Sequence, residues 1–273
     1  MTDSKQKKCN ILTLNKYKRE NTKAVMVTAY DFPQAQLAQQ AGVDMILVGD
    51  SLGMTTLGYE STIPVTMEDM ISHCHAVKRG ADKTFIIGDM PFLSYQASDE
   101  DAVRNAGRFI QAGMDCIKLE GMVESRIKAI SEAGIMVMGH LGLTPQSQAK
   151  LGGHRVQGKT KEAFREILDQ AKRVQDAGCS FLLLEAMPVE PAKMIAEELS
   201  IPVYGIGAGD RTDGQLVIMH DLIGMFFEFK PKFAKRYCEA GKLIRESLES
   251  YCSEVRDGSF PSEENFYAPL EDF

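Results

Sequence analysis

A repeated pattern of polar and apolar positions runs along the chain: a helix-like segment ends on a glycine, a short apolar run follows, and a polar residue closes the run. The first clear copy is AGVDMILVGDSLG at residues 41–53, and further copies are QAGMDCIKLEG, EAGIMVMGH, DAGCSFLLLEAM and the looser RGADKTFIIGD. Continuously apolar runs are typical of parallel strands buried on both faces. The pattern therefore predicts strands alternating with helices, with a polar group where each buried strand ends.

The expected strands are the short apolar runs themselves. They cover residues 24–29, 45–48, 84–88, 116–119, 135–139, 181–184, 203–206 and 215–220. Helices are expected between them, most clearly over residues 160–178, where apolar side chains recur at helical spacing. A short helix is expected at residues 13–21 and a helical tail over residues 230–256. Residues 50–64 and 140–159 are expected to form long, polar, glycine-rich loops.

The alternation of strands and helices favours a (β/α)₈ TIM barrel, within the α/β class, over an open doubly wound sheet. In a closed barrel the carboxyl ends of all strands face one mouth, whereas an open sheet builds its ligand site at a switch point from fewer strands. Polar residues follow many different strands here, which favours the barrel. The length of 273 residues suits this fold, which needs roughly 250. We expect a single domain over residues 1–273, with a short N-terminal helix and a C-terminal helical tail.

Composition and charge narrow the choice of partners. The formal net charge of −7 argues against a nucleic acid or an anionic membrane as partner. No apolar run approaches the ~18 residues of a membrane span, and no signal peptide is visible. The six cysteines contain no C-x-x-C pair and are expected to be reduced, structural thiols. We therefore expect a cytoplasmic protein that acts on small molecules.

Five polar residues close the second to sixth expected strands. They are Asp50, Asp89, Glu120, His140 and Glu185. Carboxylates that lie close together repel one another unless a cation or protons lie between them. Oxygen ligands without a cysteine–histidine cluster beside them favour Mg²⁺. The barrel therefore predicts a magnesium site at its mouth, the alternative being that one or two of the acids cap helices or pair with a lysine.

Three further features stand near these acids. Lys118 precedes Glu120 by two residues, so both side chains point to the same face of the strand. A buried lysine needs an anionic partner, which is either a structural carboxylate or a carboxylate of the substrate. Ser51 follows Asp50 and is either a hydrogen-bond donor of the site or an ordinary loop serine. The glycines of GIGAG at residues 205–209 fit a phosphate-binding loop, the packing of a cosubstrate or a tight turn.

Longer motifs, in order along the chain, resemble the ketopantoate hydroxymethyltransferase family. They are GDSLGMTTLGYESTIPVTMEDM, DMPFLSY, IKLEG, GHLGLTPQS, GGHRVQG, LLLEAMPVE, GIGAGDRTDGQ and FKPKFAKRY, and they lie within residues 25–237. The resemblance implies a (β/α)₈ barrel that assembles as a homo-oligomer, commonly a decamer. It also implies an enzyme of pantothenate and coenzyme A biosynthesis.

The resemblance further implies a reaction and roles for individual residues. The implied enzyme moves the one-carbon unit of 5,10-methylenetetrahydrofolate onto C3 of 3-methyl-2-oxobutanoate through a Mg-stabilised enolate, giving 2-dehydropantoate. The implied Mg²⁺ ligands, with one ion per subunit, are Asp50, Asp89 and Glu120. The implied keto-acid contacts are Asp50, Ser51, Asp89, Lys118 and His140. Glu185 is the implied catalytic base.

Two other interpretations stay open at this point. The first is another Mg-enolate barrel enzyme of the phosphoenolpyruvate mutase and isocitrate lyase type. Such enzymes usually carry a cysteine in a KKCGH-like loop, and the corresponding loop here, HLGLTPQSQAKLGGHRVQG, has none. The second is a catalytically silent barrel that acts as a binding protein. That interpretation would predict the loss of an acid or of Lys118, and none of them is lost.

Overall fold

Eight parallel strands close into a barrel in sequence order, with β8 paired against β1. The computed structural model describes residues 8–153, 155–268 and 270. The strands are β1 (Ala24–Thr28), β2 (Met45–Val48), β3 (Phe85–Asp89), β4 (Cys116–Glu120), β5 (Val137–Gly142), β6 (Phe181–Glu185), β7 (Val203–Ile206) and β8 (Gly214–Val217). The predicted (β/α)₈ barrel is therefore confirmed.

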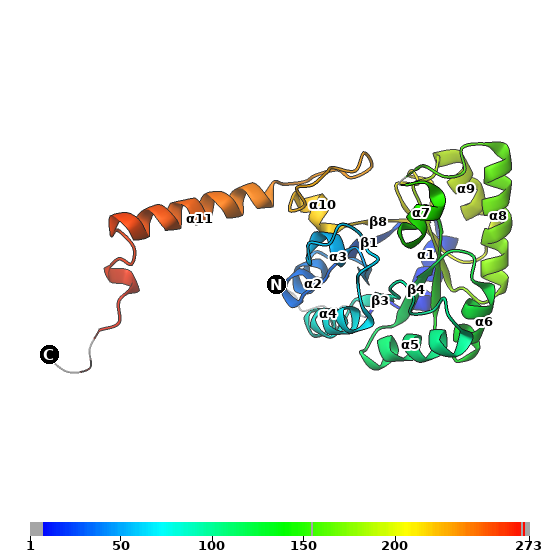
Figure 1. Cartoon of the computed structure of the whole chain (residues 1–273), viewed down its shortest axis with the longest axis horizontal. Coiled ribbons are helices and arrows are strands. Elements are labelled where there is room, and N and C mark those ends of the chain that lie inside the picture. The colour runs from blue at the N-terminus through cyan, green and yellow to red at the C-terminus, as the bar shows by residue number, and fades with distance from the viewer. Residues whose placement is uncertain (1–7, 154, 269, 271–273) are drawn as a thin grey trace. The chain divides into compact units, whose positions relative to one another are not determined.

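The longer helices between the strands lie on the outside of the barrel (Figure 1). The helices of the described chain are α1 (Ile11–Arg19), α2 (Phe32–Gln40), α3 (Leu52–Thr55), α4 (Met67–Gly80), α5 (Asp99–Gln111), α6 (Glu124–Glu132), α7 (Gln148–Leu151), α8 (Lys161–Asp176), α9 (Val189–Glu198), α10 (Met219–Ile223) and α11 (Ala240–Asp257), with 3₁₀ turns at Pro145–Ser147 and Glu263–Asn265. Local sequence explains several starts. Thr66 and Asp69 form a capping box at the start of α4, and Asp31 caps α2.

The core lies in two layers that divide the residues of each strand between them. Met45 and Leu47 belong to a cluster that takes alternate residues from every strand, so this cluster fills the barrel interior. Ile46 and Val48 belong to the other cluster, between the barrel and its helices. Leu14 of α1 joins the inner cluster, so the N-terminal helix closes the amino-terminal end of the barrel.

Four expected elements differ from those observed. The expected loop over residues 50–64 contains the short helix α3. The expected loop over residues 140–159 begins inside β5 and contains α7. The eighth strand ends at Val217, so that His220 lies in α10. The tail is helical only from Ala240 to Asp257, and the expectation of a helix from residue 230 was wrong. Pro231 explains part of the error, because a proline disfavours helical geometry at the residue before it.

The chain divides into two compact units, one ending at Met219 and one covering His220–Phe273. The first contains the barrel, and the second contains α11. The expectation of a single domain stays a prediction. Within the described residues, no helix is long and apolar enough to cross a membrane. All six cysteines are free, as expected.

The fit of helix α5 against β3 makes a prediction about stability. A Cβ added at Gly88 would lie 2.4 Å from Cδ1 of Phe109 on α5, so Gly88→Ala should destabilise the fold by about 1–3 kcal/mol. Gly107 lies on the same helix with nothing within 4 Å of an added Cβ. Gly107→Ala should therefore stabilise the protein by about 0.5–1 kcal/mol through helix propensity. Urea unfolding measures both changes, and an unchanged midpoint for Gly88→Ala would mean that Phe109 moves aside without cost.

Candidate active site

The alternation of side chains places five polar residues on the inner face of the barrel at the carboxyl ends of four strands. Met138, Ile87 and Leu183 point inward, and residues two further along their strands point the same way. The inward residues are Asp89 of β3, Lys118 and Glu120 of β4, His140 of β5 and Glu185 of β6. Asp50 follows β2 directly. The carboxyl ends of these strands therefore meet at one mouth of the barrel, as predicted.

Lys118 lies between two buried carboxylates. Its Nζ donates to Oδ1 of Asp89 at 2.7 Å and lies 3.4 Å from Oε1 of Glu120. The register of β3 and β4 places Asp89 directly beside Lys118. Burial alone would lower the pKa of Lys118, but Asp89, Glu120 and Asp50 outweigh it, so its pKa is raised. Lys118 therefore carries a positive charge at neutral pH, and its protein partners are structural carboxylates.

Asp50 is held against Asp89 and is buried, with 4% of its surface exposed. The backbone N–H of Asp50 donates to Oδ2 of Asp89 at 3.0 Å. Burial, followed by the negative charge of Asp89, raises the pKa of Asp50 well above its usual range, and Lys118 only partly offsets this. The site therefore contains more negative charge than its own cations neutralise.

His140 connects two carboxylates on either side of it. Its Nδ1 lies 3.3 Å from Oε1 of Glu120, and its Nε2 lies 3.2 Å from Oε2 of Glu185. Neither nitrogen meets the full geometric criteria for a hydrogen bond, so these contacts are mainly electrostatic. Burial alone would lower the pKa of His140, but Glu120 and Glu185 raise it to about 9. His140 is therefore an imidazolium at neutral pH.

Glu120 is ionised despite its burial. Burial opposes ionisation, but Lys118 and His140, together with the backbone N–H of Gln146, lower its pKa to about 2. Both of its oxygens are occupied, since Oε1 lies near Lys118 and His140 while Oε2 accepts the Gln146 N–H at 3.0 Å. Glu120 therefore has little freedom to turn toward another partner.

Glu185 differs from the other acids in its access to solvent. Its side chain is 17% exposed, against 2% for Glu120. The chain turns sharply just after it, because Ala186 has a φ of +49°, which is uncommon for a residue with a side chain. The N–H of Ala186 donates to the carbonyl oxygen of Ile206, and its carbonyl oxygen accepts from Gln157. These bonds hold Glu185 at the rim of the site, where a substrate can reach it.

Three residues that the sequence patterns did not single out complete the site. The hydroxyl of Tyr30, which follows β1, lies 2.7 Å from Oγ of Ser51 and orients it. The amide of Gln146 donates to Asp50 Oδ2 at 2.9 Å, and the hydroxyl of Tyr95 donates to the Gln146 amide oxygen at 2.7 Å. Neutral residues of this kind have no distinctive spacing in the sequence. The available signals were that Gln146 lies within GHLGLTPQS, Tyr95 within DMPFLSY and Tyr30 at a strand end.

The charges of the site suit a divalent cation. The four carboxylates Asp50, Asp89, Glu120 and Glu185 are accompanied by two cationic side chains, those of Lys118 and His140. A bound cation or a proton on Asp50 relieves the excess of negative charge. Within the described residues, no three Asp, Glu, His or Cys side chains form a ready set of direct metal ligands. The excess of carboxylate charge is what fits Mg²⁺, which commonly uses one or two carboxylates and fills its other positions with water and substrate.

The glycine-rich run at the end of β7, residues 205–209, packs closely against its neighbours. A Cβ at Gly205 would lie 3.0 Å from Oγ1 of Thr212, and one at Gly209 would lie 2.6 Å from a methyl carbon of Val189. Gly209 also has a φ of +79°, which a residue with a side chain rarely adopts. Close packing within a tight turn accounts for these two glycines, and a phosphate-binding role for the run stays a prediction.

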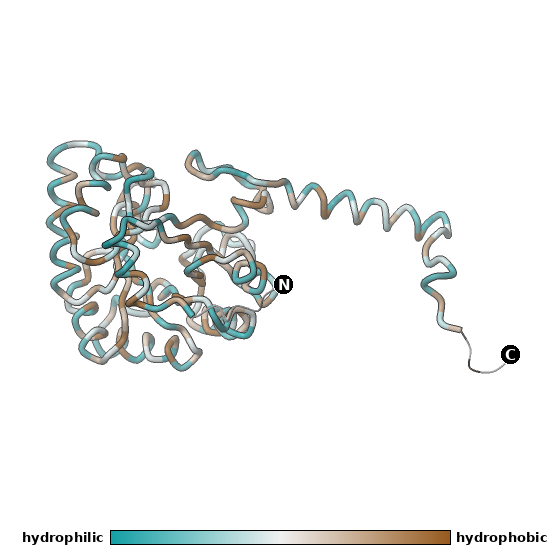
Figure 2. Tube along the Cα trace, turned by 180° about the vertical axis from the view of Figure 1, so that it is seen from behind, coloured by the Kyte–Doolittle hydropathy of each residue, from teal (hydrophilic) through white to brown (hydrophobic). Residues whose placement is uncertain are grey.

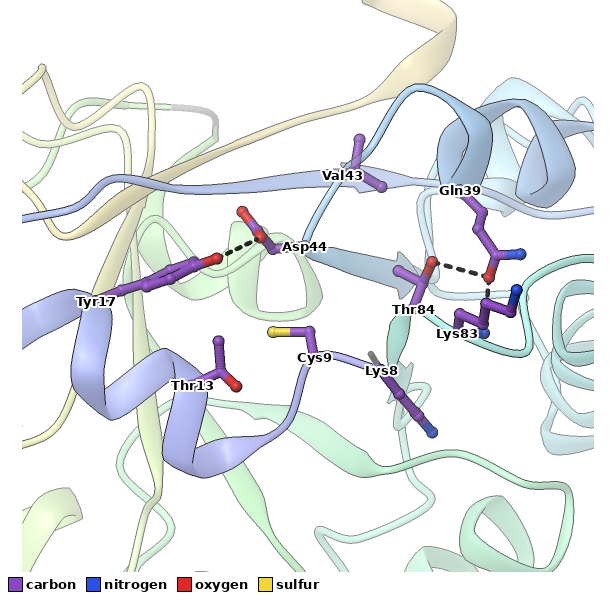
Figure 3. A pocket seen from close by; sticks show the side chains of 9 residues that line it. All are labelled: Lys8, Cys9, Thr13, Tyr17, Gln39, Val43, Asp44, Lys83 and Thr84. Carbon is purple, nitrogen blue, oxygen red and sulfur yellow. Dashed lines mark hydrogen bonds between the residues drawn. The ribbon is translucent and has the colours of Figure 1, made fainter. Parts of the chain in front are cut away.

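A separate pocket of about 270 Å³ lies at the opposite, amino-terminal ends of β2 and β3 (Figure 3). Asp44 and Thr84, which directly precede these strands, line it together with Tyr17 of α1. The Tyr17 hydroxyl donates to Asp44, and the Thr84 hydroxyl donates to the side chain of Gln39. None of the predicted site residues lines this pocket, and these hydrogen bonds already use four of its polar side chains.

Comparison with known proteins shows which family this chain resembles. The ketopantoate hydroxymethyltransferase family matches residues 8–263. The 3-methyl-2-oxobutanoate hydroxymethyltransferase of Alkaliphilus metalliredigens is 56% identical, over 97% of this chain and 95% of its own length. The enzyme of the same name from Thermoanaerobacter sp. is 50% identical, over 96% of this chain and 97% of its own.

The fold also matches more distant barrels. The phosphoenolpyruvate phosphomutase of Streptomyces platensis subsp. rosaceus superposes with a TM-score of 0.61 at 15% identity, covering 96% of this chain and 92% of that one. Identity this low shows a shared fold and no more. By contrast, the family match over residues 8–263 and the identities of 50% and 56% are strong enough to show the family. The chain therefore belongs to the ketopantoate hydroxymethyltransferase family.

Proposed function

We propose that this protein is a 3-methyl-2-oxobutanoate hydroxymethyltransferase. It takes the one-carbon unit of 5,10-methylenetetrahydrofolate and attaches it to C3 of 3-methyl-2-oxobutanoate, giving 2-dehydropantoate and tetrahydrofolate, with water supplying the hydroxyl oxygen. The observation that carries the proposal is the buried cluster of acids around Lys118 at the barrel mouth, in a chain that belongs to this family.

Mg²⁺ is the proposed cofactor, with one ion per subunit, and Asp50, Asp89 and Glu120 are the residues that would hold it. When bound, it supplies a Lewis acid that polarises the keto group and stabilises the negative charge that develops there. Glu120 already uses both oxygens within the protein. A water-mediated contact with the ion therefore suits Glu120 better than a direct bond, since Mg²⁺ tends to keep part of its hydration shell.

Lys118 and Ser51 are the proposed anchors for the keto acid. Lys118 stays protonated inside the barrel, so it can attract the carboxylate of the substrate while remaining bound to Asp89. Ser51 donates a hydrogen bond from the hydroxyl that Tyr30 orients. His140, which lies between Glu120 and Glu185, is a further proposed substrate contact. These groups hold the substrate with C3 near the rim of the site.

Glu185 is the proposed base. It is the most exposed carboxylate of the cluster, and it comes from a different strand than the three acids assigned to the cation. Its carboxylate removes the proton from C3, and the electron pair of that C–H bond forms the enolate. The Nε2 of His140 lies 3.2 Å from Oε2 of Glu185. The carbon nucleophile then forms a C–C bond to the methylene carbon of the cosubstrate as one C–N bond breaks. Water replaces the second nitrogen on that carbon, which releases 2-dehydropantoate and tetrahydrofolate.

Proton exchange at C3 tests the proposed function. In D₂O, we expect the purified protein to replace the C3 proton of 3-methyl-2-oxobutanoate with deuterium when Mg²⁺ is present, without any folate. Removing the ion with EDTA should abolish the exchange, and added Mg²⁺ should restore it. Proton NMR follows the reaction, and calorimetry measures the binding of the keto acid with and without the ion. Tight binding or exchange that is independent of metal would count against the proposal.

Assembly into a homo-oligomer, with a decamer as the family suggests, is also proposed. The second unit contains α11, which alternates apolar and polar residues along its length (Figure 2). Its apolar side chains Leu243, Ile244, Leu248, Tyr251 and Val255 are each about half exposed. A stripe of this kind is typical of a surface that pairs with another chain. Light scattering should show a mass several times that of one chain at micromolar concentration, and a monomer would contradict the proposal.

The remaining proposals concern location and partners. Free cysteines throughout suit a reducing compartment, so the cytoplasm is the proposed location. Small molecules are the proposed partners, because the net negative charge disfavours binding to nucleic acid or to an anionic membrane.

A further inference from the structure

Gln146 lies at the centre of the hydrogen bonds that join the acids of the site. It follows β5 in the turn Pro145–Ser147 and is only 6% exposed. Its backbone N–H donates to Oε2 of Glu120 at 3.0 Å, and its side-chain Nε2 donates to Oδ2 of Asp50 at 2.9 Å. One residue of the loop after β5 therefore binds carboxylates at the ends of two other strands, which are not neighbours in the barrel.

The surroundings leave the Gln146 amide a single orientation. Its Nε2 also lies 3.0 Å from the carbonyl oxygen of Met90, which can only accept a hydrogen bond, so the nitrogen must face that side. The amide oxygen then faces Tyr95, whose hydroxyl donates to it at 2.7 Å, and Gln96, whose Nε2 lies 3.3 Å away. Both hydrogens and both acceptor positions of the amide are thus used.

Tyr95 supports Gln146 and Glu120 together. Its hydroxyl has one hydrogen, which goes to Gln146 over the shorter distance, and its oxygen accepts the backbone N–H of Glu120 at 3.1 Å. Tyr95 is 1% exposed, so these bonds form away from water. Where water is excluded, a fully satisfied network of this kind holds its members in one arrangement.

We propose that Gln146, oriented by Tyr95, is a positioning residue that fixes Asp50 and Glu120 for the binding of Mg²⁺. This inference rests on the proposed function. Gln146 occupies Oδ2 of Asp50, while no hydrogen bond from the described part of the chain reaches Oδ1, which is left for the ion. Gln146 also draws Oε2 of Glu120 to the loop. As a neutral donor, Gln146 holds the two acids in place without adding a positive charge that would compete with the cation.

The experiment measures binding of Mn²⁺, used as a probe for Mg²⁺, by electron paramagnetic resonance without substrate. Gln146→Met keeps the length of the side chain but removes its donors, and the affinity should fall about 10- to 100-fold. Tyr95→Phe removes one supporting bond and should weaken binding about 2- to 10-fold. Gln148→Met, two residues along and without a bond to the acids in the described chain, should bind like the wild type.

The double variant separates positioning from general support of the fold. If Tyr95 acts through Gln146, Gln146→Met with Tyr95→Phe should bind Mn²⁺ about as well as Gln146→Met alone. The proposal would be overturned if the losses of Mn²⁺ affinity in the two single variants were fully additive in the double variant. It would also be overturned if those losses only followed a fall in the melting temperature. Affinities within two-fold of the wild type in both single variants would overturn it as well. Tyr95→Phe keeps the test decisive if Gln146→Met does not fold.

The wild type distinguishes this inference from the proposed reaction. The wild type could bind Mn²⁺ more tightly than the variants and yet exchange no C3 proton. That result would overturn the proposed reaction and support the positioning role. If the wild type binds no Mn²⁺, the positioning role is overturned, because the acids then hold no divalent cation.

Discussion

Replacing Glu185 with glutamine is expected to reduce kcat by about 10²- to 10⁴-fold, the range for loss of a general base. The amide has nearly the shape of the carboxylate, but it cannot take the C3 proton. Binding of the keto acid should change little, because its proposed anchors, Lys118 and Ser51, lie on β4 and after β2 rather than on β6. Deuterium exchange at C3 should therefore be lost while calorimetry still shows binding.

The matched control is Glu190→Gln, which makes the same change at an exposed acid in the first turn of α9, five positions along. This variant should exchange the C3 proton at the wild-type rate. If Glu185→Gln also exchanges at the wild-type rate, the base is another group. His140 would not be the immediate alternative, because a pKa of about 9 leaves it protonated at neutral pH.

The barrel and most of its acids could be predicted because local rules determine them. Short, continuously apolar runs become strands wherever both faces are covered, and β2 and β7 begin and end where the pattern placed them. Alternation within a strand predicted that Lys118 and Glu120 share a face, and the 3.4 Å contact confirms it. Closure of the barrel then brings the strand ends together.

The remaining features of the site depend on contacts between distant segments. The register between β3 and β4 pairs Lys118 with Asp89, and no local pattern specifies that register. His140 was expected at the start of a loop, but β5 continues to Gly142 and holds it between two acids. Gln146 and Tyr95 act through neutral hydrogen bonds across 51 positions of sequence. Their residue types carry no chemical signature until the fold brings them together.

Lys118→Met is expected to have the largest effect on the fold. The change leaves Asp89 and Glu120 buried without the cation that lies 2.7 Å from one and 3.4 Å from the other. Removing one partner of a buried ion pair commonly costs about 3–5 kcal/mol of unfolding free energy, because the other charge stays buried and unpaired. The melting temperature should fall accordingly, and binding of the keto acid should become undetectable by calorimetry.

Lys128→Met is the control for this change. Lys128 pairs with Glu132 at 3.8 Å on the surface, with both side chains 68% exposed, and loss of such a pair should change stability by less than about 1 kcal/mol. Excess Mg²⁺ should restore part of the stability lost in Lys118→Met, because a cation among the acids replaces some of the missing charge. It should leave Lys128→Met unchanged. A loss below 1 kcal/mol in Lys118→Met would mean that the acids take up protons at little cost, and that Lys118 serves the substrate rather than the fold.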